Sequence, residues 1–277
     1  QNYQTQTHMA KGQKIGSLFY DIDGDNKELM KKIEAAKKEA VSIGATYVDR
    51  KKRSVALLLK TYQCPLFIRG AHRLEYIEPQ AEEPFFFHPD TAMFRIKGER
   101  KGQRDELLTA LQVKKGERVL YCTLGRGSDS IVISYAVGEE GCVVSLEKKF
   151  PIAYVVQKGL QTYESPDHEI NEAMRRIHVI SQDAVDYLRK QPDYSFDVIY
   201  IDPMFEQTVE ASSNFASLRT VAAYEQLTDE WIREARRVAK KRVVLKDHFR
   251  SNRLERYDFK RFIRPSSKTH FGVWEKE

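Results

Sequence analysis

The stretch at residues 118–130, Arg-Val-Leu-Tyr-Cys-Thr-Leu-Gly-Arg-Gly-Ser-Asp-Ser, constrains the fold more than any other part of this 277-residue chain. Residues with strand character run into a loop that contains Gly125 and Gly127, and an apolar segment of helical length follows. Glycine suits such a loop because the backbone must turn tightly and let a ligand approach without a Cβ atom in the way. The order of strand, glycine turn and helix predicts the first unit of a doubly wound α/β sheet. Ser128 or Asp129 is expected to cap the helix.

Three further strand-like segments each end in an acidic residue, and these acids are Glu147, Asp183 and Asp202. In a doubly wound sheet the carboxyl ends of the parallel strands meet at one edge, where ligands bind, so we expect the three acids beside the glycine loop. Glu147 follows Gly125 by 22 positions, close to the spacing at which such folds place a carboxylate that binds two ribose hydroxyls. The pattern therefore predicts a nucleotide-type ligand at this edge.

The tetrapeptide Asp-Pro-Met-Phe at residues 202–205 ends the last of these strands. An acid, a rigid proline and an aromatic ring at a strand terminus suit a planar group that bears an amine. The Asp202 carboxylate and the Pro203 carbonyl would accept hydrogen bonds from the amine, and Phe205 would stack on the ring. Asp-Pro is also a common turn sequence, but its position near Gly125 favours a binding site.

Composition limits the class of protein. With 41% hydrophobic residues the chain can bury a full core, and no apolar run approaches the roughly 20 residues that span a bilayer. The three cysteines form no Cys-x-x-Cys pair, which fits a reducing cytoplasm, and the seven histidines show no paired spacing, so we expect no metal site. Residues 1–13 are polar and are left out of the fold prediction.

The pattern predicts two domains, a small α/β domain at residues 1–96 and the doubly wound domain at residues 97–277. Residues 93–96 read as extended, and residues 97–104 read as a charged linker that contains glycine. The three consecutive phenylalanines at residues 85–87 cannot all face one side of a strand. They indicate either a plug of core between the domains or a platform on which a base stacks.

Positive charge is concentrated near the carboxyl terminus. Residues 233–268 contain 14 Lys or Arg and 4 Asp or Glu, a local net charge of +10 against a formal +6 for the whole chain. This excess favours contacts with the phosphate backbone of a nucleic acid, for which Arg250, Arg253 and Arg256 are the candidates, although a solvated helix face is the alternative.

The glycine loop, the Leu-Glu-Lys of residues 146–148, the Asp-Pro-Met-Phe element and the Lys-Arg-Val-Val-Leu-Lys of residues 241–246 together resemble a known family. It is the methyltransferase J-like family of class I S-adenosylmethionine-dependent enzymes, which methylate the exocyclic amine of a guanine in bacterial small-subunit ribosomal RNA. The resemblance covers about residues 85–274. It implies a seven-stranded Rossmann-like sheet, in which residues 270–275 form the last, antiparallel strand. One departure is that residues 125–129 read Gly-Arg-Gly-Ser-Asp where better-known members have Gly-Leu-Gly-Arg-Asp.

The resemblance implies that the cofactor is S-adenosylmethionine and that the nucleic acid bound by the three arginines is RNA. The residues expected to contact it are Thr123, Gly125, Gly127, Ser128, Asp129, Glu147, Lys148, Asp183, Ala184 and Asp202. The expected reaction is a direct methyl transfer in which Asp202 aligns the amine and accepts its proton while Phe205 stacks on the guanine. The alternatives are a methyltransferase for transfer RNA, DNA or a small molecule, a nicotinamide-dependent dehydrogenase, and an inert RNA-binding module. The absence of a third glycine in the loop argues against the dehydrogenase.

Overall fold

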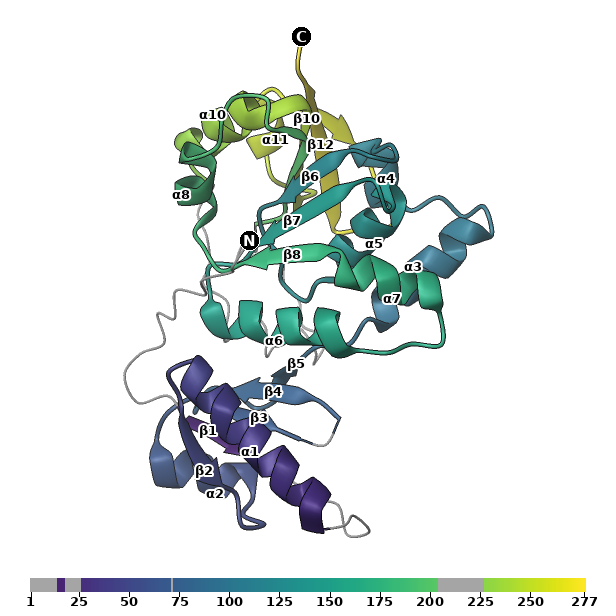
Figure 1. The fold of residues 1–277 in the computed structure, drawn as a ribbon. Coiled ribbons are helices and arrows are strands. Elements are labelled where there is room, and N and C mark those ends of the chain that lie inside the picture. The colour runs from purple at the N-terminus through teal and green to yellow at the C-terminus, as the bar shows by residue number, and fades with distance from the viewer. Residues whose placement is uncertain (1–13, 18–25, 71, 204–226) are drawn as a thin grey trace.

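The computed structural model describes residues 14–17, 26–70, 72–203 and 227–277. Strands in these ranges form two sheets, of five and seven strands, and helix α6 (Phe150–Thr162) lies between them in Figure 1. Within the same ranges no helix combines the length and the apolar composition needed to cross a membrane.

The smaller sheet is built from the first part of the chain. Its strands, in spatial order, are β2 (Thr46–Asp49), β1 (Lys14–Ser17), β3 (Leu66–Arg69), β4 (Leu74–Ile77) and β5 (Phe85–Phe86). Successive side chains of β3 point to opposite faces, as strand geometry requires. Phe67 therefore joins a core cluster with Ala40 of α1 (Asn26–Ser42), whereas Leu66 packs with Leu58 of α2 (Val55–Tyr62).

The larger sheet confirms the predicted doubly wound architecture. Its strands, in spatial order, are β11 (Lys260–Phe262), β12 (Thr269–Glu275), β10 (Ala239–His248), β9 (Phe196–Ile201), β6 (Arg118–Tyr121), β7 (Cys142–Leu146) and β8 (Ile177–Ile180). The five strands from β10 to β8 are parallel, and β12 pairs antiparallel with β10, as expected for the last strand.

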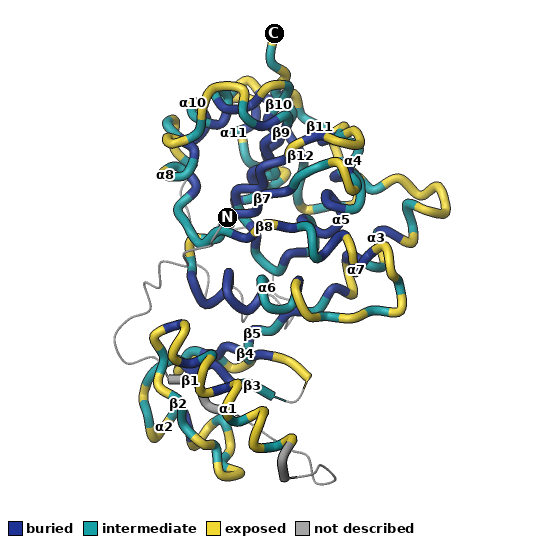
Figure 2. Tube along the Cα trace, in the orientation of Figure 1, coloured by how far each residue is buried: buried dark blue, intermediate teal, exposed yellow. Residues whose placement is uncertain are grey.

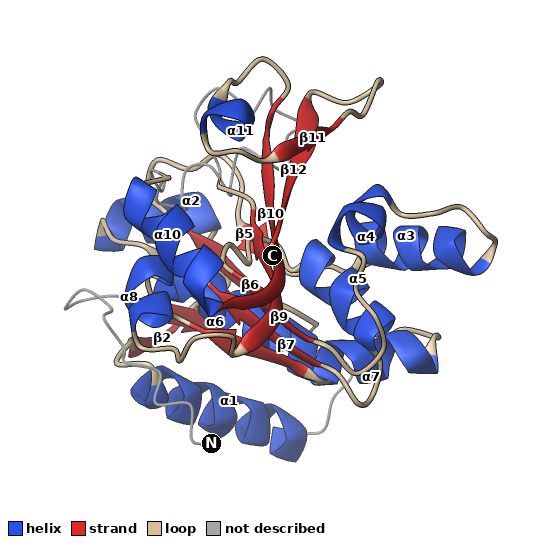
Figure 3. Cartoon of the chain, turned by 90° about the horizontal axis from the view of Figure 1, so that it is seen from above, coloured by secondary structure: helices blue, strands red, loops and turns tan. Residues whose placement is uncertain are grey.

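Helices cover both faces of this sheet (Figure 3). They are α3 (Asp90–Arg100), α4 (Glu106–Leu111), α5 (Ser128–Val137), α6, α7 (His168–Arg175), α8 (Ala184–Arg189), α10 (Asp229–Val238) and the short α11 (Arg253–Arg256). Leu120 of β6 packs with α8 and α10, whereas its neighbour Val119 packs with α4 and α5. The strand order reverses between β6 and β9, and the crevice at such a reversal is where doubly wound folds bind ligands.

The structure corrects the expectation for residues 93–104. Residues 93–96, expected to be extended, lie in helix α3, which continues to Arg100 and therefore passes through residue 97. Ala92 and Ile96, four residues apart, are both buried in one core cluster with Ile131 of α5, so packing stabilises a helix despite Gly98. The division into domains at residue 97 stays a prediction.

Two of the three consecutive phenylalanines are core residues. Phe85 and Phe87 are buried, and Phe87 packs against Gly159 of α6, where a Cβ atom would lie only 2.1 Å from the ring. Figure 2 shows buried residues both in α6 and in the adjacent strands β4 and β5. This confirms the interpretation of the segment as a plug of core, here between the small sheet and α6.

Candidate active site

Backbone hydrogen bonds continue past the ends of the central strands and hold the expected site residues side by side. The amide of Leu124 donates to the carbonyl of Leu146 at 2.8 Å, and the amide of Glu147 donates to the carbonyl of Ile180 at 3.0 Å. The amide of Gln182 in turn donates to the carbonyl of Glu147 at 3.1 Å. The glycine loop, Glu147 and the start of α8 therefore form one continuous edge.

The glycine loop requires its two glycines. Gly125 and Gly127 have φ angles of 55° and 88°, in the left-handed region that other residues rarely adopt. A Cβ atom on Gly127 would also lie 2.9 Å from Cγ1 of Val156. Gly127 is the N-cap of α5 and no side chain caps that helix, so the expected capping by Ser128 or Asp129 is wrong.

Glu147 is fixed against the glycine loop. Its Oε1 accepts a hydrogen bond from the amide of Gly125 at 3.4 Å, and its Oε2 accepts one from the amide of Lys149 at 3.0 Å. Burial raises the pKa of the Glu147 carboxyl to about 7, although the hydrogen bonds from backbone amides oppose that rise. A carboxylate held this way at a strand end is suited to accept hydrogen bonds from a pair of hydroxyls.

Lys148 and Asp183 form the next part of the edge. Lys148 Nζ lies 3.7 Å from Asp183 Oδ2, and Asp183 Oδ1 accepts a hydrogen bond from the amide of Asp186 at 3.0 Å. Asp183 is therefore the N-cap of α8, and Ala184 begins that helix as a buried residue. The structure thus brings these residues together with Glu147 and the glycine loop.

Asp202 stands on the other side of the strand reversal. Its amide donates to Thr123 Oγ1 at 2.9 Å, which ties the end of β9 to the end of β6. Its Oδ2 lies 3.7 Å from Lys246 Nζ on β10. Burial raises the pKa of Asp202, the Lys246 ammonium opposes that rise, and the Asp129 carboxylate adds to it. Pro203 is buried, while Phe205 lies outside the described residues.

Asp129 is engaged inside the protein. Its Oδ1 accepts a hydrogen bond from Arg95 Nη1 at 2.6 Å, and its Oδ2 accepts one from the Tyr200 hydroxyl at 3.1 Å. Burial alone would raise the pKa of Asp129, but the Arg95 charge is the main reason that it lies below its usual range. Arg95 also binds the Asp105 carboxylate at 2.7 Å, so α3 is anchored to the starts of α4 and α5. Sequence reasoning missed Arg95 because its segment was expected to be extended.

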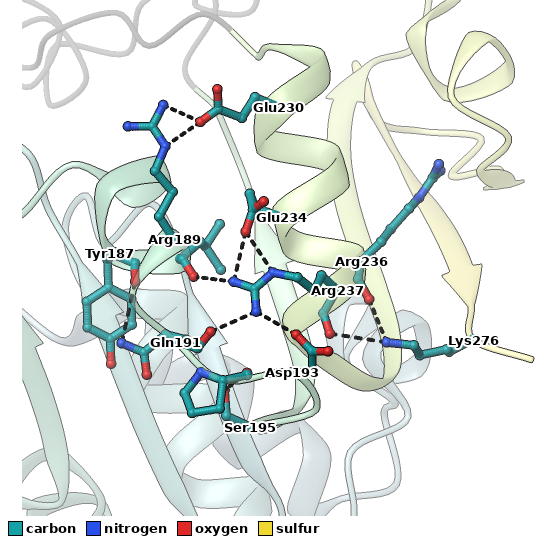
Figure 4. Close-up of polar contacts among 12 residues, drawn as sticks. Tyr187, Arg189, Gln191, Asp193, Ser195, Glu230, Glu234, Arg236, Arg237 and Lys276 are labelled. Carbon is teal, nitrogen blue, oxygen red and sulfur yellow. Dashed lines mark hydrogen bonds and ion pairs between the residues drawn. The ribbon is translucent and has the colours of Figure 1, made fainter.

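Much of the positive charge near the carboxyl terminus has internal partners. Figure 4 shows Arg237, whose guanidinium donates to Asp193 at 2.7 Å, to Glu234 at 2.8 Å and to the carbonyl of Gln191 at 2.8 Å. Lys276 donates to backbone carbonyls at the end of α10, including that of Ala239 at 2.8 Å. These cations hold α8, α10 and the chain terminus together, so the local net charge overstates what is available to a polyanion.

The three arginines expected to contact RNA differ in their surroundings. Arg253 Nε lies 3.1 Å from Asp247 Oδ2, and the Asp247 side chain is fully buried. Arg250 and Arg256, by contrast, are exposed. The structure therefore places two of the three on the surface, whereas Arg253 neutralises a buried acid.

The described edge is rich in carboxylates and lacks a cluster suited to a metal. In the described ranges, no group of three or more His, Cys, Asp or Glu side chains is placed to bind an ion. Glu147 and Asp183 lie on the side of the strand reversal that carries the glycine loop. Asp202 lies on the other side. Such an arrangement can bind a ligand that carries hydroxyls and positive charge on one side and a group with N–H donors on the other.

Residues 66–275 match the protein family described as "Putative SAM-dependent methyltransferase". The chain is 42% identical to the uncharacterized protein YpiP of Bacillus subtilis over 241 residues, which span 87% of this chain and 93% of that protein. It is 31% identical over 217 residues to the ribosomal RNA small subunit methyltransferase J of Buchnera aphidicola, spanning 74% of this chain and 81% of that protein. Two further proteins of that name, from Acinetobacter baylyi and Laribacter hongkongensis, are matched over 40% and 52% of their own length.

The fold is similar to that of a SAM-dependent methyltransferase from Neisseria gonorrhoeae, known from its crystal structure. The TM-score is 0.54 and the match covers 95% of each chain. The sequence identity is 16%, so this likeness concerns the fold alone. It agrees with the Rossmann-like methyltransferase sheet that the sequence predicts.

Proposed function

Because this chain belongs to the methyltransferase J-like family of S-adenosylmethionine-dependent methyltransferases, we propose that it methylates the exocyclic amine of a guanine in RNA. The family uses S-adenosylmethionine, which is the cofactor of this chain too. Small-subunit ribosomal RNA is the proposed substrate, since several relatives are named as methyltransferases of that RNA. Their identity to this chain is about 30%, and the experiment described below identifies the methylated base directly.

The described residues fit the cofactor. S-adenosylmethionine supplies a methyl group on a positively charged sulfur and carries a ribose with two hydroxyls. The observation that carries the proposal is the Glu147 carboxylate, which the amide of Gly125 holds at the strand end, where it can accept hydrogen bonds from that ribose. Gly125 and Gly127 place no side chain at their own positions in the loop, and the carboxylates of Glu147, Asp183 and Asp202 favour a cationic ligand.

Three other residues complete the proposed cofactor side. Lys148 and Ala184 flank Asp183 at the edge of the site, and Thr123 closes the end of β6 through its hydrogen bond from Asp202. We assign Asp129 a positioning role instead of a cofactor contact, because Arg95 and Tyr200 already bind both of its oxygens. Ser128 begins α5, so its amide lies at the positive end of the helix dipole.

The proposed chemistry needs one acid on the substrate side. Asp202 accepts a hydrogen bond from the guanine amine and so directs the nitrogen lone pair toward the methyl carbon. As the new N–C bond forms and the S–C bond breaks, the amine proton passes to Asp202. Pro203 adds a backbone carbonyl, and Phe205 supplies a face on which the base stacks. Orientation accounts for most of the rate because the methyl donor is already activated.

Methyl transfer to defined nucleic acids tests this proposal. The protein is incubated with S-adenosylmethionine labelled in its methyl group and with unmodified transcripts of small-subunit ribosomal RNA or transfer RNA, or with DNA. Mass spectrometry of the nucleosides should show N2-methylguanosine in the ribosomal transcript, and Asp202→Ala should form it about 10²-fold or more slowly. Methylation of another base, or of the transfer RNA or DNA alone, would overturn the assigned substrate.

A further inference from the structure

A pocket of about 370 Å³ lies between α3, α4 and β12, and Asp129 at the start of α5 also lines it. Phe94 and Arg104 line it, as do Lys246 of β10 and Arg264. Figure 3 shows α3 and α4 together on one flank of β10 and β12. Because Lys246 Nζ is also 3.7 Å from Asp202 Oδ2, one residue belongs both to this pocket and to the proposed catalytic site.

The acids in the pocket wall already have partners. Arg95 binds both Asp105 and Asp129, and Arg264 binds Glu106. The other two cations of the wall, Arg104 and Lys246, are held less closely by acids. The exposed Arg104 makes no ion pair among the residues that the structure describes, and the contact of Lys246 with Asp202 exceeds hydrogen-bond length. The pocket therefore offers positive charge to an anionic group.

Phe94 contributes an aromatic surface to the same pocket. Helix α3 buries Ala92 and Ile96 against its neighbours, so Phe94 between them points outward and is 77% exposed. Its ring is not needed in the core. An exposed aromatic ring beside cationic side chains is the arrangement with which many proteins bind single-stranded nucleic acid, because bases stack on the ring and cations contact the backbone.

We propose that this pocket binds the nucleotide adjacent to the methylated guanine, with its base on Phe94 and its phosphate against Arg104 and Lys246. This inference rests on the RNA substrate proposed above and names where the strand runs after it leaves Asp202. The volume lies at the lower end of the range of roughly 300–1,000 Å³ found for small-ligand sites, which suits one nucleotide. Lys246 then links the phosphate of this nucleotide to the acid that holds the target amine.

Binding of a fluorescein-labelled single-stranded oligoribonucleotide that contains one guanine tests this inference, with S-adenosylhomocysteine present. Phe94→Ala should weaken binding by about 5-fold to about 150-fold, the range for loss of one base stack, and Phe94→Trp should restore it. Arg104→Ala should lower the salt dependence by about 0.7, the value for one phosphate contact to a single strand. Tyr194→Ala is the matched control. Tyr194 is 60% exposed and precedes β9, so it lies at the amino ends of the parallel strands, opposite the carboxyl ends that form the site.

The outcomes separate this inference from the proposed function. If the unaltered protein binds and methylates RNA, and Phe94→Ala does so equally well, the pocket does not bind the adjacent nucleotide and the proposed function stands. Equal losses for Phe94→Ala and Tyr194→Ala would also overturn the inference. If the unaltered protein neither binds nor methylates any RNA, the proposed function itself fails. Calorimetric titration with S-adenosylmethionine should give unchanged affinity for every variant.

Discussion

The Lys246 ammonium lies 3.7 Å from the Asp202 carboxylate, so β10 supplies a cation beside the acid that ends β9. Burial raises the pKa of Asp202, and Lys246 is the main group that opposes the rise. The pair therefore sets the pH above which Asp202 is a carboxylate. In our proposal only the carboxylate accepts the amine hydrogen bond and the proton, which ties the pH dependence of methyl transfer to Lys246.

Lys246→Gln should move the acidic limb of the pH–rate profile to higher pH. Removal of the cation raises the pKa of Asp202 further, so a larger share of the protein is inactive at any pH below the plateau. Single-turnover methyl transfer measured across pH shows the limb directly. Lys240→Gln is the control, since Lys240 is an exposed residue of the same strand. An unmoved limb for Lys246→Gln would show that Asp202 does not titrate in the reaction.

Cofactor affinity should rise with pH because of Glu147. Its pKa of about 7 means that much of the free protein carries a protonated Glu147 near neutrality, whereas two ribose hydroxyls need the carboxylate as acceptor. Affinity for S-adenosylmethionine should therefore increase from about pH 6 to about pH 8. At pH values below the pKa of Glu147, cofactor binding should release the proton of that carboxyl. At a pH where Glu147 of the unaltered protein is a carboxylate, Glu147→Gln should weaken cofactor binding by about 1.5 to 3 kcal/mol. The same variant should flatten the pH dependence of binding. Calorimetry in buffers of different ionisation enthalpy measures both effects.

The contact between Phe87 and Gly159 predicts non-additive stability changes. A Cβ at position 159 would lie 2.1 Å from the Phe87 ring and 2.6 Å from Phe87 Cβ, so ring rotation cannot relieve the clash. Gly159→Ala should destabilise by about 1 to 3 kcal/mol despite the helix propensity of alanine, and Phe87→Ala by about 3 to 5 kcal/mol. The double variant removes the two closest contacts, which are to the ring at 2.1 and 2.2 Å, and keeps the 2.6 Å contact to the Cβ at position 87. Its loss of stability, measured by urea unfolding, should therefore be smaller than the sum of the two single losses. Strict additivity would mean that the two residues are not in contact.

Replacing Arg253 by alanine should affect stability, whereas replacing Arg250 or Arg256 should affect RNA binding. Arg253→Ala leaves the fully buried Asp247 carboxylate without its ion-pair partner, and breaking such a pair costs about 3 to 5 kcal/mol of stability. Arg250→Ala and Arg256→Ala should leave the free energy of unfolding nearly unchanged and lower the salt dependence of RNA binding. Thermal unfolding and binding at several salt concentrations separate the two. If Arg250→Ala and Arg256→Ala keep the salt dependence of the unaltered protein, Arg250 and Arg256 belong to a solvated face.

The sheet and its carboxyl edge could be predicted from the sequence because each relevant residue is adjacent to a buried strand. Gly125, Glu147, Asp183 and Asp202 each follow an apolar run, and parallel strands bring their ends together whatever the rest of the chain does. A pattern of this kind needs only local information. The structure forms the expected edge at these positions because the carboxyl ends of parallel strands meet there.

The contacts that surround this edge depend on residues far apart in the chain. Arg95 and Asp129 are 34 positions apart, and α3 is a helix because Ala92 and Ile96 pack on α5, a contact that local propensity does not report. The charge count near the carboxyl terminus is limited for the same reason, because it does not say which cations have internal partners. It could not reveal that Arg237 pairs with Asp193 or that Arg264 pairs with Glu106.

Asp202 and Phe205 should have separable effects on methyl transfer. Asp202→Ala should lower the single-turnover rate by about 10²-fold or more, the range for a lost acid–base group, and should cost some cofactor affinity because Asp202 lies at the junction of the two sides of the site. Phe205 lies outside the described residues, and its expected part is to stack on the guanine. Phe205→Ala should therefore weaken RNA binding by about 1 to 3 kcal/mol with unchanged affinity for S-adenosylmethionine.

Phe205→Trp separates stacking from any other contribution of that side chain, because it keeps an aromatic face and should retain most of the activity. Single-turnover kinetics with the ribosomal transcript, alongside calorimetry with the cofactor, provides both readouts. If Phe205→Ala is fully active, the base stacks elsewhere. Phe85 and Phe87 cannot take that part because both are buried, which leaves Phe86 of the same segment. The Arg73 guanidinium lies 3.7 Å from the centre of the Phe86 ring, so a guanine there would meet an aromatic ring with a cation on one face.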